Sequence, residues 1–292
     1  MVKNIYRKIR KKYNKFIKKK RISRKLEISE NSNIQDLLID GFSIYDSFID
    51  KNILNNIIRK YQLDEQNFKK SYTNVAIPIL DDEFINYISN HKKINSIVED
   101  FYFSTYGTKA FLQTPPSIVI TNPSFKKSKE DYSIPHKWHT DYKSEFTFHI
   151  PLTDINSDST KTVYAEKSQN ILSIDSQSNL NINDYESNII PLEAKKGSVI
   201  FIDVSGAHKA ELGKFRAMIQ FKFTSGNDLF NEIVKPQTYF DVGKKFKENF
   251  LLNTNQLKIA FYDDLQKINN LSNKWEVIKE SKVYYENFLK AL

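Results

Sequence analysis

Short apolar segments separated by turn-forming residues occupy the middle of the chain. They are rich in β-branched and aromatic side chains and comprise residues 111–121, 145–153, 162–166, 197–204 and 215–224. Because no helical pattern alternates with these segments, they predict antiparallel strands rather than a parallel sheet. We therefore expect a double-stranded β-helix, a jelly-roll or cupin-like barrel, over about residues 111–224.

Helical periodicity lies on both sides of this predicted core. Apolar residues recur at helical spacing in residues 50–61, 82–106, 255–268 and 273–291. Asp50 stands where the first of these helices needs an N-cap, and Gly107 where the second needs a C-cap. A short strand is expected from Gly41, and the polar residues 174–188 are expected to form a loop. The predicted class is α+β, with C-terminal helices over 227–292.

Positive charge is concentrated at the start of the chain. Of the 44 Lys and Arg residues, 13 lie in residues 1–25, which contain no Asp or Glu; the remaining 31 face 35 acidic residues. Residues 1–27 are expected to form a basic amphipathic arm, followed by a single catalytic domain over 28–292. Two interpretations of the arm stay open, contact with an anionic membrane surface and a partly ordered, solvated tail. Nucleic-acid binding is not favoured, because the body of the chain is mildly acidic.

Composition restricts the chemistry of the chain more than its fold. There is no Cys, so any metal must be held by His and carboxylate side chains, and the chain has only five His. No apolar run is long enough to cross a bilayer and no secretory signal pattern is found, so a cytoplasmic location is expected. Phosphate-binding loops, nucleophile elbows and zinc-protease motifs are also missing.

A candidate metal site centres on the motif WHTD at residues 138–141. In an extended strand residues i and i+2 point to the same face, so His139 and Asp141 can reach one metal ion. His208 is the candidate for a third ligand, because it follows the apolar strand at 197–204 and a Gly turn. Two His and one carboxylate are the ligand set of non-haem Fe(II) oxygenases. In the alternative interpretation the first two residues form a structural hydrogen-bonded pair and the third is a turn residue.

Arg216 is a second candidate binding residue, eight positions after His208. In the strand that it opens, alternation places it on one face with Met218, Gln220 and Lys222. A charged Arg directed into a barrel needs an anionic partner, and a guanidinium binds a carboxylate through two charge-assisted hydrogen bonds. The distal carboxylate of 2-oxoglutarate would suit this position, with the keto-acid end of the same molecule on the iron.

With these residues the chain resembles the phytanoyl-CoA dioxygenase-like family of Fe(II)/2-oxoglutarate-dependent oxygenases. The resemblance covers roughly residues 40–225 and rests on residues 138–141, 146–154 and 197–216. It implies that the two His and the Asp ligate iron and that Arg216 binds 2-oxoglutarate. Retention of Asp141 argues against the halogenase variants, which open that position for chloride.

Two departures from the family concern the surroundings of the site. The family usually has a Gly-Pro stretch and then Gly-Ser-His after its middle strand, where this chain reads TKTVYAEKSQ over 160–169. A polar residue often lies two places after the distal His, where this chain has Ala210. The local turn, the substrate contacts and one cosubstrate contact are therefore expected to differ.

Five further side chains carry weaker signals. Gln113 and Thr147 lie on strands that flank the proposed site and are additional candidates for contact with the cosubstrate. Of the other His residues, His149 is expected in the core or behind the ligands, and His136 and His91 at the surface.

The predicted function is an Fe(II)- and 2-oxoglutarate-dependent dioxygenase that hydroxylates a small molecule, lipid or glycan precursor. O2 and 2-oxoglutarate would be consumed with release of succinate and CO2, while the protein holds and aims the reactants. One alternative is a metal-binding barrel without catalysis. Another is an adaptor, associated with a membrane or nucleic acid, whose oxygenase fold has lost its activity.

Overall fold

The computed structural model describes residues 34–61, 63, 75–79, 82–107, 110–121, 137–141, 146–171, 180–182 and 188–225. The basic arm at 1–27, His136, most of the loop at 174–188 and the C-terminal helices at 227–292 lie outside these described residues, and they stay predictions. No helix in the described part of the chain is both long and apolar enough to span a bilayer.

The helices of the described region precede the main strands in the sequence. They are α2 (Gln35–Asp40), α3 (Lys51–Tyr61), α4 (Asp82–Asn90) and α5 (Lys92–Tyr106). Asp50 Oδ1 accepts a hydrogen bond from Asn52 N at 2.7 Å, and Gly107 ends α5 in the left-handed conformation with φ 66°. Both predicted caps are therefore confirmed.

The helix predicted over 82–106 is in fact two helices that meet at His91. This residue has extended φ and ψ angles of −69° and 104°, and its Nδ1 accepts a hydrogen bond from Ile94 N at 3.4 Å. The imidazole is part-buried and lies 4.8 Å from the Phe48 ring, measured between ring centroids. His91 is thus a part-buried N-cap packed against an aromatic ring, a role that was not predicted for it.

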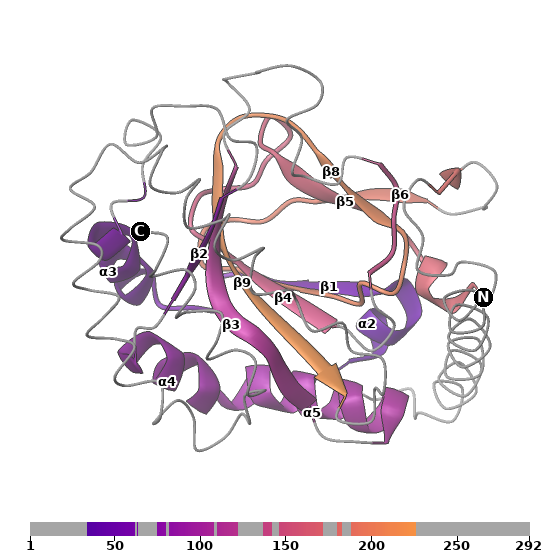
Figure 1. Cartoon of the computed structure of the whole chain (residues 1–292), viewed down its shortest axis with the longest axis horizontal. Helices are drawn as coiled ribbons and strands as arrows, with labels where there is room; N and C mark the ends of the chain where they lie inside the picture. The colour runs from indigo at the N-terminus through magenta and orange to yellow at the C-terminus, as the bar shows by residue number, and fades with distance from the viewer. Residues whose placement is uncertain are drawn as a thin grey trace, which may run out of the picture.

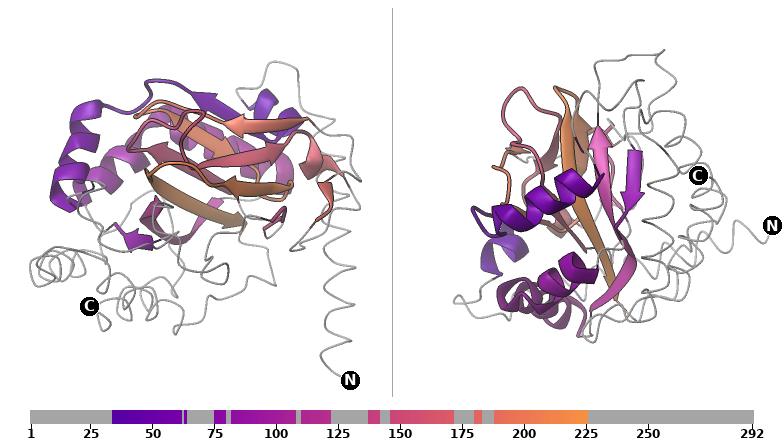
Figure 2. Two further views of the ribbon diagram at one scale, coloured as in Figure 1. Left: turned by 90° about the horizontal axis from the view of Figure 1, so that it is seen from above. Right: turned by 90° about the vertical axis from the view of Figure 1, so that its left-hand side faces the viewer.

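Nine strands form two antiparallel sheets in the described part of the chain. The larger sheet has the order β1-β7-β4-β9-β3-β2, with β1 (Phe42–Tyr45), β2 (Val75–Pro78), β3 (Ala110–Thr121), β4 (Phe146–Pro151), β7 (Val199–Ile202) and β9 (Arg216–Ser225). The smaller has the order β6-β5-β8, with β5 (Lys161–Ala165), β6 (Ile189–Leu192) and β8 (His208–Glu211). In Figure 2, β9 and β3 run side by side, as their register requires.

The predicted class, helices with antiparallel sheets, is confirmed. Each of the five predicted β segments of the core contains a strand, as does the one expected from Gly41. Strands β2, β6 and β8 were not predicted. The closure of the two sheets into a double-stranded β-helix stays a prediction.

Strand β7 shows how the layers pack. Val199 and Phe201 belong to the core that the larger sheet shares with the helices, whereas Ile200 and Ile202 pack with Tyr164 of the smaller sheet. All four β7 residues are at most 2% exposed, which explains why the strand is a continuous apolar run without alternation. Figure 1 shows α4 and α5 below the larger sheet and the strands β5, β6 and β8 above it.

Strand β9 separates the apolar core from a polar face. Its predicted apolar face is confirmed, since it contributes to the helical core the residues Ala217, Ile219, Phe221 and Phe223. The other face carries Arg216, Gln220 and Lys222, and the register with β4 places Gln220 opposite His149 and Lys222 opposite Thr147. Polar side chains of β4 and β9 therefore share the face turned away from the helices.

The turn after β5 forms without the Gly-Ser-His sequence. Lys167 takes the left-handed conformation with φ 63°, a region that glycine enters at least cost. Ser168 Oγ accepts a hydrogen bond from Ala207 N at 2.7 Å. The buried Gln169 amide donates to the carbonyl of Ile39 at 2.9 Å. The left-handed Lys167 and the buried Gln169 amide thus form the turn for which the family uses Gly-Ser-His.

Replacing Lys167 with Gly is expected to raise the free energy of unfolding by about 0.5–1 kcal/mol, because a left-handed non-glycine residue carries a steric penalty of about that size. The Lys167 side chain is 61% exposed, so little packing is lost. Urea denaturation measures the change. Lys195→Gly is the control, since exposed Lys195 has no positive φ and Gly there should destabilise. An equal change in the free energy of unfolding for the two substitutions would contradict backbone strain at Lys167.

Candidate metal centre

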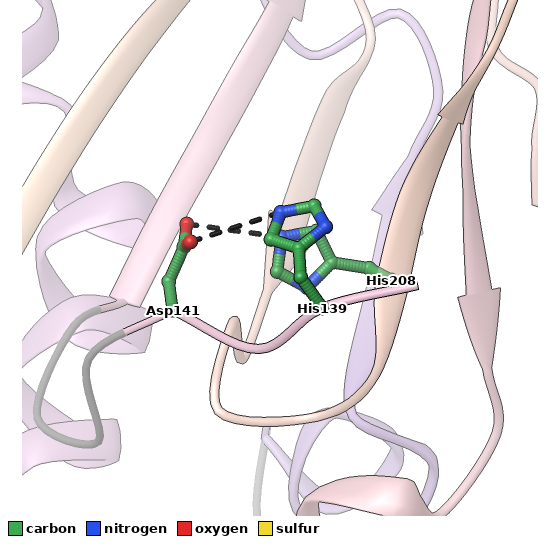
Figure 3. Close-up of side chains that lie close together, drawn as sticks. All are labelled: His139, Asp141 and His208. Carbon is green, nitrogen blue, oxygen red and sulfur yellow. Dashed lines mark ion pairs between the residues drawn. The ribbon is translucent and has the colours of Figure 1, made fainter. Parts of the chain in front are cut away.

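The structure brings together the side chains of His139, Asp141 and His208, and Figure 3 shows them facing one another. One ligand atom from each lies within 4.8 Å of the others. Asp141 Oδ1 is 3.7 Å from His139 Nε2, and its Oδ2 is 3.7 Å from His208 Nε2. This is the one cluster of its kind among the described residues.

Backbone hydrogen bonds, rather than a strand, bring these residues together. His139 N donates to His208 O at 3.0 Å, and His208 N donates to His139 O at 2.9 Å, forming an isolated antiparallel bridge. Asp141 N donates to Val204 O at 2.9 Å. The prediction that the motif at 138–141 lies on a strand is therefore wrong, because only one residue pair bridges there. His208 follows a Gly turn as predicted, but it begins β8.

The two imidazoles are oriented in the same way. His139 Nδ1 lies 2.9 Å from the Lys137 carbonyl oxygen, and His208 Nδ1 lies 3.0 Å from the Gly206 carbonyl oxygen. A carbonyl can only accept, so each Nδ1 carries a proton, and in the neutral ring each Nε2 then has a lone pair free for a metal. Both lone pairs are on the ring side nearer Asp141, which is the arrangement that a shared metal ion requires.

Local electrostatics favour the metal-binding protonation states. Burial and the nearby His208 lower the pKa of His139. Burial alone would raise the pKa of Asp141, but its neighbours His208, Lys222 and His139, in that order, hold it well below its usual range. At neutral pH the cluster therefore offers a neutral imidazole at His139 and an ionised carboxylate, as metal ligation needs.

The donor set fits a divalent first-row metal. Donor atoms about 2.1 Å from a shared ion and at right angles lie about 3 Å apart, so gaps of 3.7 Å close with small side-chain rotations. The His139 and His208 side chains are only 12% and 10% exposed, whereas that of Asp141 is 33% exposed. Two imidazoles and one carboxylate also leave coordination positions open for further ligands.

Arg216 is buried on the polar face of β9, and its guanidinium is only partly hydrogen-bonded by the described residues. The residue is 4% exposed, and its Nη2 donates to Thr121 Oγ1 at 3.3 Å, while its Nε has no hydrogen-bond partner among the residues that the structure describes. Burial lowers the pKa of Arg216 to about 10, so the guanidinium stays charged at neutral pH. A buried cation without a carboxylate partner is costly, and it is suited to an anionic ligand.

His149 of β4 and Gln220 of β9 pair with each other on the same polar face. Burial, and after it the charge of Arg216, lowers the pKa of His149 to about 3, so the imidazole is neutral. Gln220 Nε2 is 3.0 Å from His149 Nε2 and donates to it. The expectation that His149 is buried is confirmed. Its pairing with Gln220 was missed, because only the β4–β9 register reveals it.

The two weaker candidates for cosubstrate contact stay predictions. Thr147 is buried, and its hydroxyl donates to the Phe221 carbonyl at 2.8 Å, so the proton of this hydroxyl is already used. Gln113 belongs to β3, but the orientation of its side chain is outside what the structure describes.

No protein-family model and no curated protein sequence matches this chain. Among solved structures it is similar to the epimerase SnoN in complex with Fe3+, alpha ketoglutarate and nogalamycin RO, at 12% identity over 65% of this chain and 81% of that one, with a TM-score of 0.49. The carbocyclase SnoK from nogalamycin biosynthesis has 12% identity, coverages of 69% and 85%, and a TM-score of 0.49. EctD from S. alaskensis with 2-oxoglutarate and 5-hydroxyectoine has 11% identity over 68% of this chain and 76% of that one, with a TM-score of 0.49.

Removing a ligand side chain should weaken binding of a divalent metal. We expect His139→Ala and Asp141→Ala each to lower the affinity for Co(II) by more than about 100-fold, since loss of a second-shell partner alone costs about 10- to 100-fold. Titration followed by visible absorption measures it. His91→Ala, which removes a helix cap outside the cluster, should keep wild-type affinity. Unchanged binding in the first two variants would exclude this cluster as the metal site.

Proposed function

We propose that the protein is an Fe(II)- and 2-oxoglutarate-dependent dioxygenase. The observation that carries this proposal is a buried guanidinium on the polar face of β9, the face whose Lys222 acts electrostatically on Asp141 of the cluster of two His and one Asp. A metal cluster alone would equally suit a structural site. The combination with a buried cation at Arg216 favours an enzyme that binds an anionic cosubstrate next to its metal.

In this proposal His139, Asp141 and His208 hold iron, and Arg216 binds the distal carboxylate of 2-oxoglutarate. Bound iron would supply the reaction of O2 with 2-oxoglutarate, from which succinate and CO2 leave. The Arg216 guanidinium would gain a carboxylate partner, which no described residue supplies, and so orient the keto-acid end toward the cluster.

The surrounding residues of the chain supply the environment. On the polar face of β4 and β9, Thr147, His149 and Arg216 are each at most 5% exposed, so a carboxylate bound at Arg216 would be largely shielded from water. His149 is held neutral beside Arg216 and adds no second positive charge. Lys222 lies farther along β9 and helps keep Asp141 ionised.

The finer parts of the proposal are the barrel, the family and the reaction. We infer that the two antiparallel sheets are the two walls of a double-stranded β-helix, as in the phytanoyl-CoA dioxygenase-like family. The reaction proposed is hydroxylation of a small molecule, lipid or glycan precursor. A metal-binding barrel without catalysis is the alternative that the next experiment tests.

Purified protein supplied with Fe(II) and 2-oxoglutarate under air is expected to form succinate, and Asp141→Ala is expected to form none. Arg216→Met should raise the Kd for 2-oxoglutarate about 10- to 100-fold, the loss of one or two hydrogen bonds to a charged group. Calorimetry on the anaerobic Fe(II) protein measures this. Lys214→Met, on an exposed Lys two residues away, should leave it unchanged.

Three results would argue against the enzyme. Succinate formation by Asp141→Ala at the wild-type rate would show that the reaction does not need this cluster. Metal binding without any affinity for 2-oxoglutarate would favour the non-catalytic barrel. Equal 2-oxoglutarate affinity in wild type and Arg216→Met would remove the role of the buried cation.

The basic arm is proposed to hold this enzyme, otherwise cytoplasmic, at an anionic membrane surface, on the strength of its charge and amphipathic spacing. Deletion of residues 1–25 should abolish sedimentation with vesicles that contain an anionic lipid, and succinate formation should persist. Neutral vesicles are the control, because the attraction is electrostatic. Equal binding of the full and the shortened chain would exclude the arm as the contact.

A further inference from the structure

Tyr164 of β5 lies directly beside one of the proposed metal ligands. It is fully buried and is paired in register with His208 of β8. The two rings are nearly parallel, with centroids 6.5 Å apart and an interplanar angle of 11°. The phenol therefore forms a wall on one side of the His208 imidazole.

The Tyr164 hydroxyl is bonded to the turn that leads into His208. It donates to the Asp203 carbonyl oxygen at 2.8 Å. The same carbonyl accepts from Gly206 N at 3.1 Å, and the Gly206 carbonyl lies 3.0 Å from His208 Nδ1. Four residues, Tyr164, Asp203, Gly206 and His208, are thus linked in order. The series runs from the phenol to the ring nitrogen that sets the tautomer of His208.

Space around the hydroxyl depends on two Gly residues. A Cβ added at Gly206 or at Gly41 would overlap the Tyr164 hydroxyl. Gly206 has no positive φ, so the backbone there does not itself require Gly. The absence of a side chain at 206 is explained by the close approach of the phenol, which indicates that the turn and the Tyr are fitted to each other.

Two residues that follow Tyr164 bind the C-terminal end of the 203–207 turn, at Ala207. Ser168 Oγ accepts from Ala207 N at 2.7 Å, and Ala165 N donates to Ala207 O at 2.9 Å. With the bond from Tyr164 to Asp203, the residues just before His208 are attached to β5 at both ends of the turn. This attachment is independent of the backbone bridge to His139.

We infer that Tyr164 is a positioning residue for the metal site, acting through the 203–207 turn. Its hydroxyl holds the turn in the conformation that places the Gly206 carbonyl against His208 Nδ1, and thereby directs Nε2 toward the metal. The inference rests on the proposed metal site, and it adds a residue that contacts neither metal nor cosubstrate. Partners that orient a metal-ligating His contribute about 10- to 100-fold to metal affinity.

The substitution Tyr164→Phe tests this role, because it keeps the ring and removes only the hydroxyl. The full chain is titrated with Co(II), and both the Kd and the visible absorption spectrum of the bound ion are recorded. We expect about 10-fold weaker binding and an altered spectrum, since the His208 imidazole loses its fixed direction. Unfolding by urea without metal gives the accompanying loss of stability.

Tyr61→Phe is the matched control. Tyr61 is equally buried, at 2% exposed, but it lies in α3 within the helical core. This variant is expected to keep the wild-type Co(II) affinity and spectrum whatever stability it loses. A Tyr164→Phe protein with the wild-type Kd and spectrum would overturn the inference, as would the same loss of affinity in both variants. A wild-type chain that binds no Co(II) would instead overturn the metal site and the proposed function.

Discussion

The reciprocal backbone pair between His139 and His208 is the contact on which the site depends. Two hydrogen bonds of 3.0 and 2.9 Å join residues that are 69 positions apart in the chain. They align two short segments so that both imidazoles and the Asp141 carboxylate converge. Closing so long a loop costs conformational entropy, which the packing of the two sheets around the bridge has to offset.

Beside this bridge, local backbone contacts orient the two candidate imidazole ligands. Each imidazole donates from Nδ1 to a carbonyl two residues earlier in its own segment, so the orientation of the ring follows from the local backbone. Once the backbones pair, the donor atoms follow. The turn before His208 has hydrogen bonds of its own, and in addition Tyr164 of β5 donates to Asp203 O and Ser168, just after β5, accepts from Ala207 N.

Strand β9 connects the site with the core. Its apolar face packs against the helices, and its polar face carries a buried guanidinium that costs free energy unless an anion pairs with it. Core packing on one face therefore holds Arg216 in place on the other. Folding has already removed the Arg216 guanidinium from water. An anionic ligand that binds it therefore does not have to supply the free energy for that desolvation.

Much of this arrangement was predictable from the amino-acid sequence. Alternation in β9, the caps at Asp50 and Gly107 and the five core strands follow from local periodicity and backbone preference, which neighbouring residues express by themselves. The three candidate ligands could be named because His residues are few and Cys is missing. The helix break at His91 could not be foreseen, because residues on both sides of it favour a helix and the cap depends on contact with Phe48.

Only the tertiary structure decided how the distant parts meet. The sequence by itself determined which residues are able to ligate a metal and which face of β9 is polar. It did not determine that the WHTD segment forms a single bridge to β8, that His149 bonds to Gln220, or that Lys167 accepts a strained conformation. Those features depend on strand register and on contacts between segments far apart in the chain, where packing outweighs local preference.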